Sequence, residues 1–188
     1  MSLLSKKALV LLLAAVTGIG ALNAQAAKAA SSDAPAQKVS MLGGKFTFNL
    51  PKGFITTALP DSPTGASGTM YSNEATKTVV IAAENNLPEG VSVKDNDGKF
   101  LDDTLADFDT AQRKSLPDYN KLSEKSMTLK TGLGLRQVDG TATQGGGLTL
   151  NTTLMAASGT RMAVVQVISR PRDMAAHETL VKQLVSGK

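Results

Sequence analysis

Residues 44–54 read Gly-Lys-Phe-Thr-Phe-Asn-Leu-Pro-Lys-Gly-Phe, and this stretch decides where the folded part of the chain begins. Phe46, Phe48 and Leu50 alternate with polar residues, which is the period-two pattern of a strand with one buried face. Pro51 lacks a backbone donor, so the strand should end there. Three of the five phenylalanines of the chain lie in this stretch. We therefore expect it to supply much of the aromatic core.

The first 26 residues have the layout of a secretory signal peptide. Lys6 and Lys7 form a positive region, an apolar run follows over residues 8–16, and an Ala-Gln-Ala cleavage site ends at Ala26. The alternative is an uncleaved anchor, but the apolar stretch, residues 8–22, is shorter than the roughly 20 residues that a bilayer span needs. We therefore expect a periplasmic protein, exported and cleaved after Ala26.

Composition excludes several classes of site. The chain has 188 residues, 41% of them hydrophobic, which is enough for one domain with a core. It has no cysteine, which excludes disulfides, thiolate catalysis, thiolate metal sites and a lipid anchor on cysteine. With one histidine it cannot build a site from several histidines. We expect no cofactor and no metal.

The charge balance argues against a nucleic-acid partner. The net charge is +4, from 20 basic and 16 acidic residues. Lys6 and Lys7 belong to the export signal, so cleavage leaves 18 basic residues against 16 acidic ones, a net charge of +2. No run of Lys or Arg accompanies this small excess.

The order of elements predicts an α+β fold. Residues 27–38 are rich in Ala, Ser and Pro and read as a flexible tether, so the domain should span residues 39–188. Residues 56–68 read as a loop. Further strands are expected at residues 69–72, 78–83, 121–130, 133–143, 148–157 and 161–169, with glycine-rich turns at 132–134 and 145–147. With two main helices, this order gives a mostly antiparallel sheet flanked by helices.

The first helix is expected over residues 95–116. Its apolar arc is centred on Phe108, Asp97 is a plausible N-cap, and Pro117 stops it. We expect this face to lie on the sheet that Phe46 and Phe48 help to build.

The last helix is expected to be capped by Asp173 and to run to residue 185. Its apolar residues share one face. They are Met174, Leu180, Val181, Leu184 and Val185.

The acids at the start of the first helix resemble part of a calcium loop. They are Asp95, Asp97, Asp102 and Asp103, but Lys99 interrupts the oxygen ligands and no glutamate closes the loop. Capping and the helix dipole explain these acids better, with a cation site as the alternative.

His177, the only histidine, falls within the apolar arc of the last helix. Periodicity therefore predicts a buried, hydrogen-bonded histidine that packs in the core, and the alternative is a pH-sensitive contact. A catalytic role would require a nucleophile and an acid nearby, which the sequence does not place.

Four methionines fall on predicted core faces, where flexible side chains fill gaps. They are Met127, Met155, Met162 and Met174. The alternative is a methionine-lined groove for an apolar partner.

Residues 42–51, Leu-Gly-Gly-Lys-Phe-Thr-Phe-Asn-Leu-Pro, resemble the opening strand of the DcrB-like envelope proteins, and the order of later elements is similar. The resemblance implies a PsbP-like α/β/α sandwich that serves binding, in the bacterial periplasm and at the inner membrane, with roles in envelope integrity and phage sensitivity. Relatives without export signals are chaperones that grip hydrophobic segments of type VI secretion effectors. Typical members are lipoproteins, whereas this chain has no cysteine to acylate. No catalytic residues come with the family.

Three functions follow as hypotheses. The first is a non-enzymatic binding or adaptor protein whose partner is an envelope protein or the membrane surface. The second is a chaperone-like binder of hydrophobic protein segments, which requires an exposed apolar patch. The third is a hydrolase, which requires a serine hydroxyl within hydrogen-bond reach of His177.

Overall fold

The centre of the computed structural model, which describes residues 34–60 and 66–187, is a seven-stranded sheet in the order β3-β4-β5-β9-β8-β7-β6. Every pair of neighbours in it is antiparallel. The strands are β3 (Ile55–Ala58), β4 (Ser67–Asn73), β5 (Thr78–Asn86), β6 (Asn120–Thr128), β7 (Gly134–Gln144), β8 (Gly147–Ser158) and β9 (Arg161–Ser169). The mostly antiparallel α+β architecture is confirmed. The predicted signal peptide and residues 27–33 of the predicted tether lie outside the described residues.

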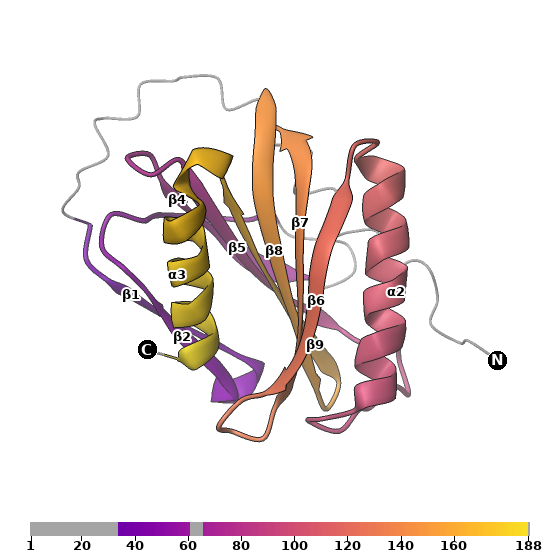
Figure 1. Ribbon diagram of the computed structural model, residues 1–188. Coiled ribbons are helices and arrows are strands. Elements are labelled where there is room, and N and C mark those ends of the chain that lie inside the picture. Colours follow the sequence, from indigo (N-terminus) through magenta and orange to yellow (C-terminus); the bar gives the residue numbers. More distant parts are fainter. Residues whose placement is uncertain (1–33, 61–65, 188) are drawn as a thin grey trace.

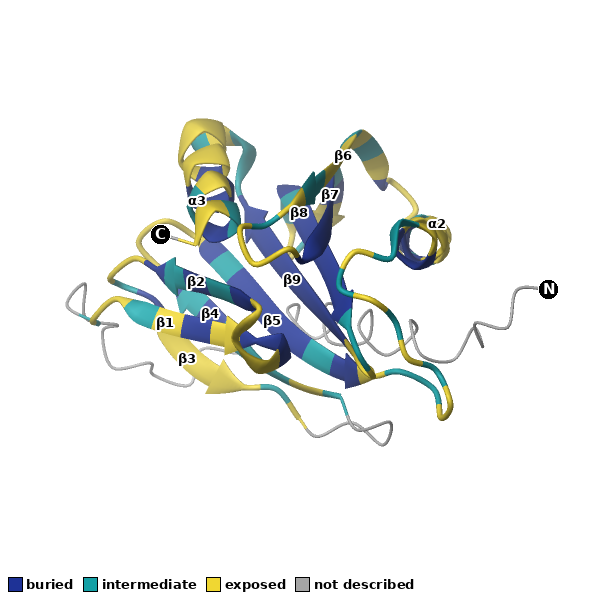
Figure 2. Ribbon diagram, turned by 90° about the horizontal axis from the view of Figure 1, so that it is seen from below, coloured by how far each residue is buried: buried dark blue, intermediate teal, exposed yellow. Residues whose placement is uncertain are grey.

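Two layers cover the sheet (Figure 1). One is the helix α2 (Gly98–Ser115), and the other combines the helix α3 (Met174–Ser186) with a two-stranded hairpin of β1 (Gln37–Met41) and β2 (Phe46–Leu50). The expected sandwich of a sheet between two helices is therefore found in part, because a β-hairpin fills half of one outer layer. Figure 2 shows β1 and β2 beside α3, with α2 well apart from both.

The strand β9 separates two cores, because successive side chains of a strand point to opposite faces. Val165 and Val167 belong to the core beneath the hairpin and α3, whereas Met162 and Val164 belong to the core beneath α2. All four side chains are buried. The nearly all-apolar sequence of β9 thus follows from its place between two covered faces.

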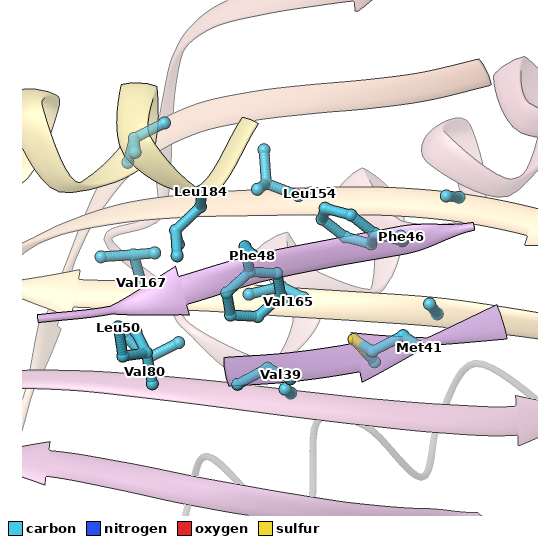
Figure 3. Packing of buried hydrophobic residues seen from close by; sticks show 14 of the residues in the cluster. Val39, Met41, Phe46, Phe48, Leu50, Val80, Leu154, Val165, Val167 and Leu184 are labelled. Atoms are coloured by element: carbon cyan, nitrogen blue, oxygen red, sulfur yellow. The ribbon is translucent and has the colours of Figure 1, made fainter. Parts of the chain in front are cut away.

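The phenylalanine strand lies in the hairpin and not in the main sheet. Phe46, Phe48 and Leu50 are fully buried between the hairpin, the sheet and α3 (Figure 3). The expectation that α2 packs on the sheet built by Phe46 and Phe48 was wrong, since Phe100 and Phe108 of α2 occupy the opposite core. An alternating pattern reveals a buried face but not the sheet to which the strand belongs.

A left-handed turn joins β1 to β2. In the turn η2 (Leu42–Gly44), φ is 51° at Leu42, 66° at Gly43 and 93° at Gly44. Glycine adopts such angles without strain, but leucine does not. The Leu42 N–H donates to Glu84 Oε1 at 2.6 Å, and Glu84 Oε2 pairs with Arg161 at 2.9 Å. These bonds and the buried Leu42 side chain hold the strained turn against β5 and β9.

The sequence patterns did not predict two of the strands, β1 and β3. The strand β1 begins at Gln37, so the folded part starts two residues before the predicted boundary, and the Gly53 N–H donates to the Ala34 carbonyl at 2.9 Å. The strand β3 (Ile55–Ala58) overlaps the first three residues of the predicted loop, residues 56–58. All four residues of β3 are exposed, so it has no apolar alternation that would reveal it. The predicted strand at residues 161–169 and the turn at Gly145 and Gly146 are confirmed.

The first helix was expected from residue 95, but α2 begins three residues later, at Gly98, and the last helix lacks its expected side-chain cap. Asp97 accepts a bond from the Phe100 N–H at 3.0 Å, which confirms it as the N-cap of α2. A short turn, η3 (Pro171–Asp173), precedes α3, and the Asp173 carboxylate pairs with Arg172 at 3.3 Å instead of capping the helix. Met174 was also misplaced on the buried face, because its side chain is 51% exposed.

Candidate functional site

A groove of about 670 Å³ lies between β6 and α3. Its floor is formed by β7 and β8, which lie between these two walls (Figures 1 and 2). Its apolar lining comes from both walls and the floor: Leu122, Met127, Leu150, Met174, Val181 and Val185. Its volume falls in the range of roughly 300–1,000 Å³ typical of ligand sites.

The groove exists because the outer layer stops short of the edge of the sheet. The helix α3 packs on β2, β9 and β8, and the hairpin occupies its other side. The sheet continues past β8 to β7 and the edge strand β6. On the face that α3 covers elsewhere, β7 and β6 therefore border the groove and are not covered by a second helix. A β-bulge between Lys121 and Ser123 interrupts the ladder of β6 and places Leu122 at the rim.

The rim carries exposed apolar side chains. Leu122 on β6 is 57% exposed and Met174 on α3 is 51% exposed, and both line the groove. Met127 lines it as well, whereas Met155 and Met162 are buried in the cores. The methionines thus divide between the two interpretations of the sequence, with Met155 and Met162 in packing and the other two in the groove.

Asp139 is a fixed anion in the floor of the groove. Its carboxylate accepts hydrogen bonds from Ser123 Oγ at 2.6 Å, Thr152 Oγ1 at 2.7 Å and Gln137 Nε2 at 2.8 Å. Lys125 Nζ approaches it at 3.3 Å. Burial pushes the pKa of Asp139 upward, but these donors outweigh burial and hold the pKa below its ordinary value. The carboxylate is therefore charged at neutral pH.

His177 is buried next to Asp139, as its place in the apolar arc predicted. Thr152 gives its only proton to Asp139, so it must accept a bond from the His177 Nε2–H at 2.9 Å. His177 Nδ1 then accepts the hydroxyl proton of Ser169, also at 2.9 Å. The result is a directed chain of hydrogen bonds from Ser169 through His177 and Thr152 to Asp139.

Burial lowers the pKa of His177, and the negative charges of Asp139 and Glu178 oppose this effect only in part. The imidazole is therefore neutral at pH 7, which agrees with the directions of its hydrogen bonds. Protonation at Nδ1 would remove the acceptor of the Ser169 hydroxyl.

The serine that the hydrolase hypothesis requires is present but inaccessible. Ser169 Oγ lies 2.9 Å from His177 Nδ1, within hydrogen-bond reach. The Ser169 side chain is only 1% exposed and does not line the groove. A substrate carbonyl cannot approach Oγ in this conformation, so the pair lacks the space that nucleophilic attack needs.

The four acids near α2 do not converge. Asp95 binds Lys45 at 2.7 Å and Ser158 at 2.6 Å, and these two donors lower its pKa. Asp97 caps α2, Asp102 pairs with Arg136 at 2.7 Å, and Asp103 pairs with Lys99 at 2.7 Å. Within residues 34–60 and 66–187, no three acidic or histidine side chains gather as metal ligands. Each acid is explained by a local partner.

The sequence pointed to His177 but not to Asp139, Thr152 or Lys125. One signal was available, because aspartate is depleted in strands and Asp139 lies in the middle of one. Its partners come from β6, β7 and β8, and only the register of these strands brings them together.

Comparison with known proteins supports the fold alone. No protein-family model matches the chain, and no curated protein sequence matches it. The fold is PsbP-like: the solution structure of the cyanobacterial PsbP protein CyanoP from Synechocystis aligns with a TM-score of 0.57 at 10% identity, over 80% of this chain and 91% of CyanoP.

Two further solved structures are less similar to this chain. One is to a Pseudomonas aeruginosa protein of unknown function described as a putative regulator (TM-score 0.49, 14% identity, 81% of this chain and 95% of that one). The other is to LpqN of Mycobacterium tuberculosis, involved in cell envelope biogenesis (TM-score 0.48, 15% identity, 80% of this chain and 87% of LpqN). Among the described helices, none is both long and apolar enough to span a membrane.

Proposed function

We propose that this chain is an exported, non-catalytic binding or adaptor protein of the bacterial envelope that holds an apolar ligand or protein segment in the groove between β6 and α3. One observation carries the proposal. Leu122 and Met174 are among the most exposed large apolar side chains of the described residues, and both line the groove. Exposed apolar side chains gathered at a concave surface are typical of binding sites.

The proposed location is the periplasm. It is supported by the signal-peptide pattern that ends at Ala26 and by the resemblance of residues 42–51 to the DcrB-like proteins. The absence of cysteine implies that the exported protein has no lipid anchor on that residue. The proposed partner is therefore an envelope protein or the membrane surface, not nucleic acid, and roles in envelope integrity or phage sensitivity come with the resemblance.

A second candidate function is that of a chaperone-like binder of hydrophobic protein segments. Met127 and Met174 favour it, because flexible thioether side chains adapt to apolar partners of varied shape. The two candidates share the groove and differ in occupant: an adaptor keeps one partner, whereas a chaperone accepts many sequences and releases them.

The proposal includes the absence of catalysis. Its support is the burial of Ser169, the hydroxyl that bonds the single histidine. Detection of hydrolysis that disappears in the Ser169→Ala variant would contradict it.

The groove can be tested with the neutral apolar dye Nile red. We expect one dye to bind per chain, and the double variant Leu122→Asn, Met174→Asn to bind it at least about tenfold more weakly, since two apolar side chains are lost from the site. The matched control is Leu148→Asn, because Leu148 is 51% exposed but does not line the groove. Equal dye binding by the double variant and the control would refute the site.

The location has its own test. Fractionation of expressing cells should recover the protein in the periplasm with Ala27 as the first residue. Recovery in the cytoplasm with an intact N-terminus would contradict export.

A further inference from the structure

We infer that the groove recognises an extended peptide segment that carries one Lys or Arg among apolar residues, with the cation replacing Lys125 on Asp139. This inference rests on the proposed function, since it names the occupant of the same groove. It is argued from the charges of the groove and from its length.

The groove holds one fixed charge, and that charge is negative. Three neutral donors from β6, β7 and β8 hold the Asp139 carboxylate in place. Because these donors belong to paired strands, the carboxylate keeps its position whether or not a cation is present. A carboxylate with a fixed position is preorganised to bind a cation.

Lys125 is a replaceable partner of this anion. Its side chain is 58% exposed and its Nζ lies 3.3 Å from Asp139, the longest of the polar contacts to that carboxylate. An exposed ion pair of this kind contributes little to stability, since side-chain entropy and solvent offset the attraction. A ligand ammonium or guanidinium can take the same place while Lys125 turns into solvent.

The other charged groups of the groove do not favour an anionic ligand. Lys182 faces Glu178 at 3.7 Å, so each lysine of the lining already lies near an acid. His177 adds no positive charge, because its Nε2–H is donated to Thr152 and its Nδ1 accepts from Ser169. An anionic ligand would have to draw both lysines away from their acids and would also meet the fixed Asp139.

The length of the groove fits a short extended peptide. The 13 residues of α3 form a wall about 20 Å long, at about 1.5 Å per residue. About six extended residues span that length at about 3.3 Å each.

The fixed anion favours a basic peptide over a fatty acid. A lysine or arginine side chain can pair with the Asp139 carboxylate, whereas the carboxylate of a fatty acid would meet a like charge there. Apolar side chains on either side of the cation would contact Leu122 and Val181.

The test uses the full chain and three labelled hexapeptides in fluorescence anisotropy: acetyl-Ala-Leu-Lys-Val-Leu-Ala-amide and the same peptide with norleucine or glutamate in place of lysine. We expect the lysine peptide to bind about tenfold more tightly than the norleucine peptide, as a charge-assisted hydrogen bond gives. Equal or tighter binding of the norleucine or glutamate peptide overturns the inference. If the norleucine peptide still competes with Nile red, the proposed function survives, whereas a failure of both dye and peptides to bind removes both.

Two substitutions then locate the charge. Asp139→Asn should abolish the preference for lysine, while Asp107→Asn on the exposed face of α2 should leave it unchanged. Lys125→Ala should strengthen binding of the lysine peptide about threefold or more, because the competing cation is gone. Weaker binding in Lys125→Ala, or stronger binding of dodecanoate than of the lysine peptide to the unaltered protein, would show an anion site instead. The comparison of the three peptides needs no variant, so it tests the inference even if Asp139→Asn fails to fold.

Discussion

Replacement of His177 by glutamine tests the buried hydrogen-bond chain through the pH dependence of stability. Burial lowers the pKa of His177 in the folded protein, whereas the unfolded chain has the ordinary value of about 6.5. The unfolded state therefore binds more protons on acidification, and the free energy of unfolding falls. The contribution of neutral His177 is complete above about pH 6.5 and is lost as the pH falls from there towards the folded pKa.

The size of the effect follows from this linkage. If His177 stays neutral in the folded protein, acidification from pH 7.5 to 5.5 lowers the free energy of unfolding by up to about 1.4 kcal/mol, the proton-binding energy of an unfolded histidine over that interval. His177 is the only histidine of the chain. Asp139, its charged neighbour, has a lowered pKa, so its contribution is lost only below about pH 4. The change in the free energy of unfolding between pH 7.5 and 5.5 therefore reports on the His177 imidazole and not on Asp139.

The assay is urea unfolding followed by circular dichroism at pH 7.5 and 5.5, with an NMR titration of the single imidazole. We expect His177→Gln to be less stable at pH 7.5, because Ser169 and Thr152 lose their partner, and to lose the difference between the two pH values. Two results would refute this account of the buried hydrogen bonds. One is a variant whose free energy of unfolding still falls by the full amount between pH 7.5 and 5.5, and the other is an imidazole that titrates at or above pH 6.5 in the folded protein.

Three further substitutions test the packing, the backbone and a buried hydroxyl. Phe48→Ala should lower the free energy of unfolding by about 3–5 kcal/mol, because Phe48 is fully buried. The control Thr47→Ala, on the outer face of β2, should lower it by less than about 1 kcal/mol in the same urea assay. Similar losses in the two variants would contradict the hairpin packing. Lys77 has φ of 50°, so Lys77→Gly should relieve backbone strain, raise the free energy of unfolding by about 0.5–1 kcal/mol and thereby raise the melting temperature. Lys77→Ala should do neither, and equal effects of the two substitutions would argue against strain. The Tyr119 hydroxyl has no hydrogen-bond partner among the described residues, and burial raises its pKa to about 12. Tyr119→Phe should therefore change the free energy of unfolding by less than about 1 kcal/mol. A larger loss in urea unfolding would reveal a partner for the hydroxyl.

Local patterns were sufficient where an element carries its own signal. The Asp97 cap and Pro117 bound α2, the apolar run at residues 161–169 is a strand, and the turn at Gly145 joins β7 to β8. Caps, prolines and left-handed glycines act within a few residues, so the sequence around them is enough. The same patterns failed for β3, whose residues are all exposed and therefore show no apolar period.

The groove shows the limit of such patterns. The sequence placed His177 on a buried face of its helix, together with Val181 and Leu184, but it did not predict the hydrogen bond from His177 to Thr152. Asp139 and Thr152 are 13 residues apart in the sequence and are joined by the register of β7 and β8. Register over such distances depends on the whole sheet, which is why the sequence alone predicted the candidate histidine but not the site around it.

By itself, the sequence determined the class of the fold and the buried strand at Phe46, Phe48 and Leu50, because alternation and turn residues act locally. Only the tertiary structure decided that this strand belongs to a separate hairpin, on the face opposite α2. It also decided that α3 and β6 enclose a groove with Asp139 in its floor. Which faces pack together depends on contacts between residues far apart in the chain, and no local period encodes those contacts.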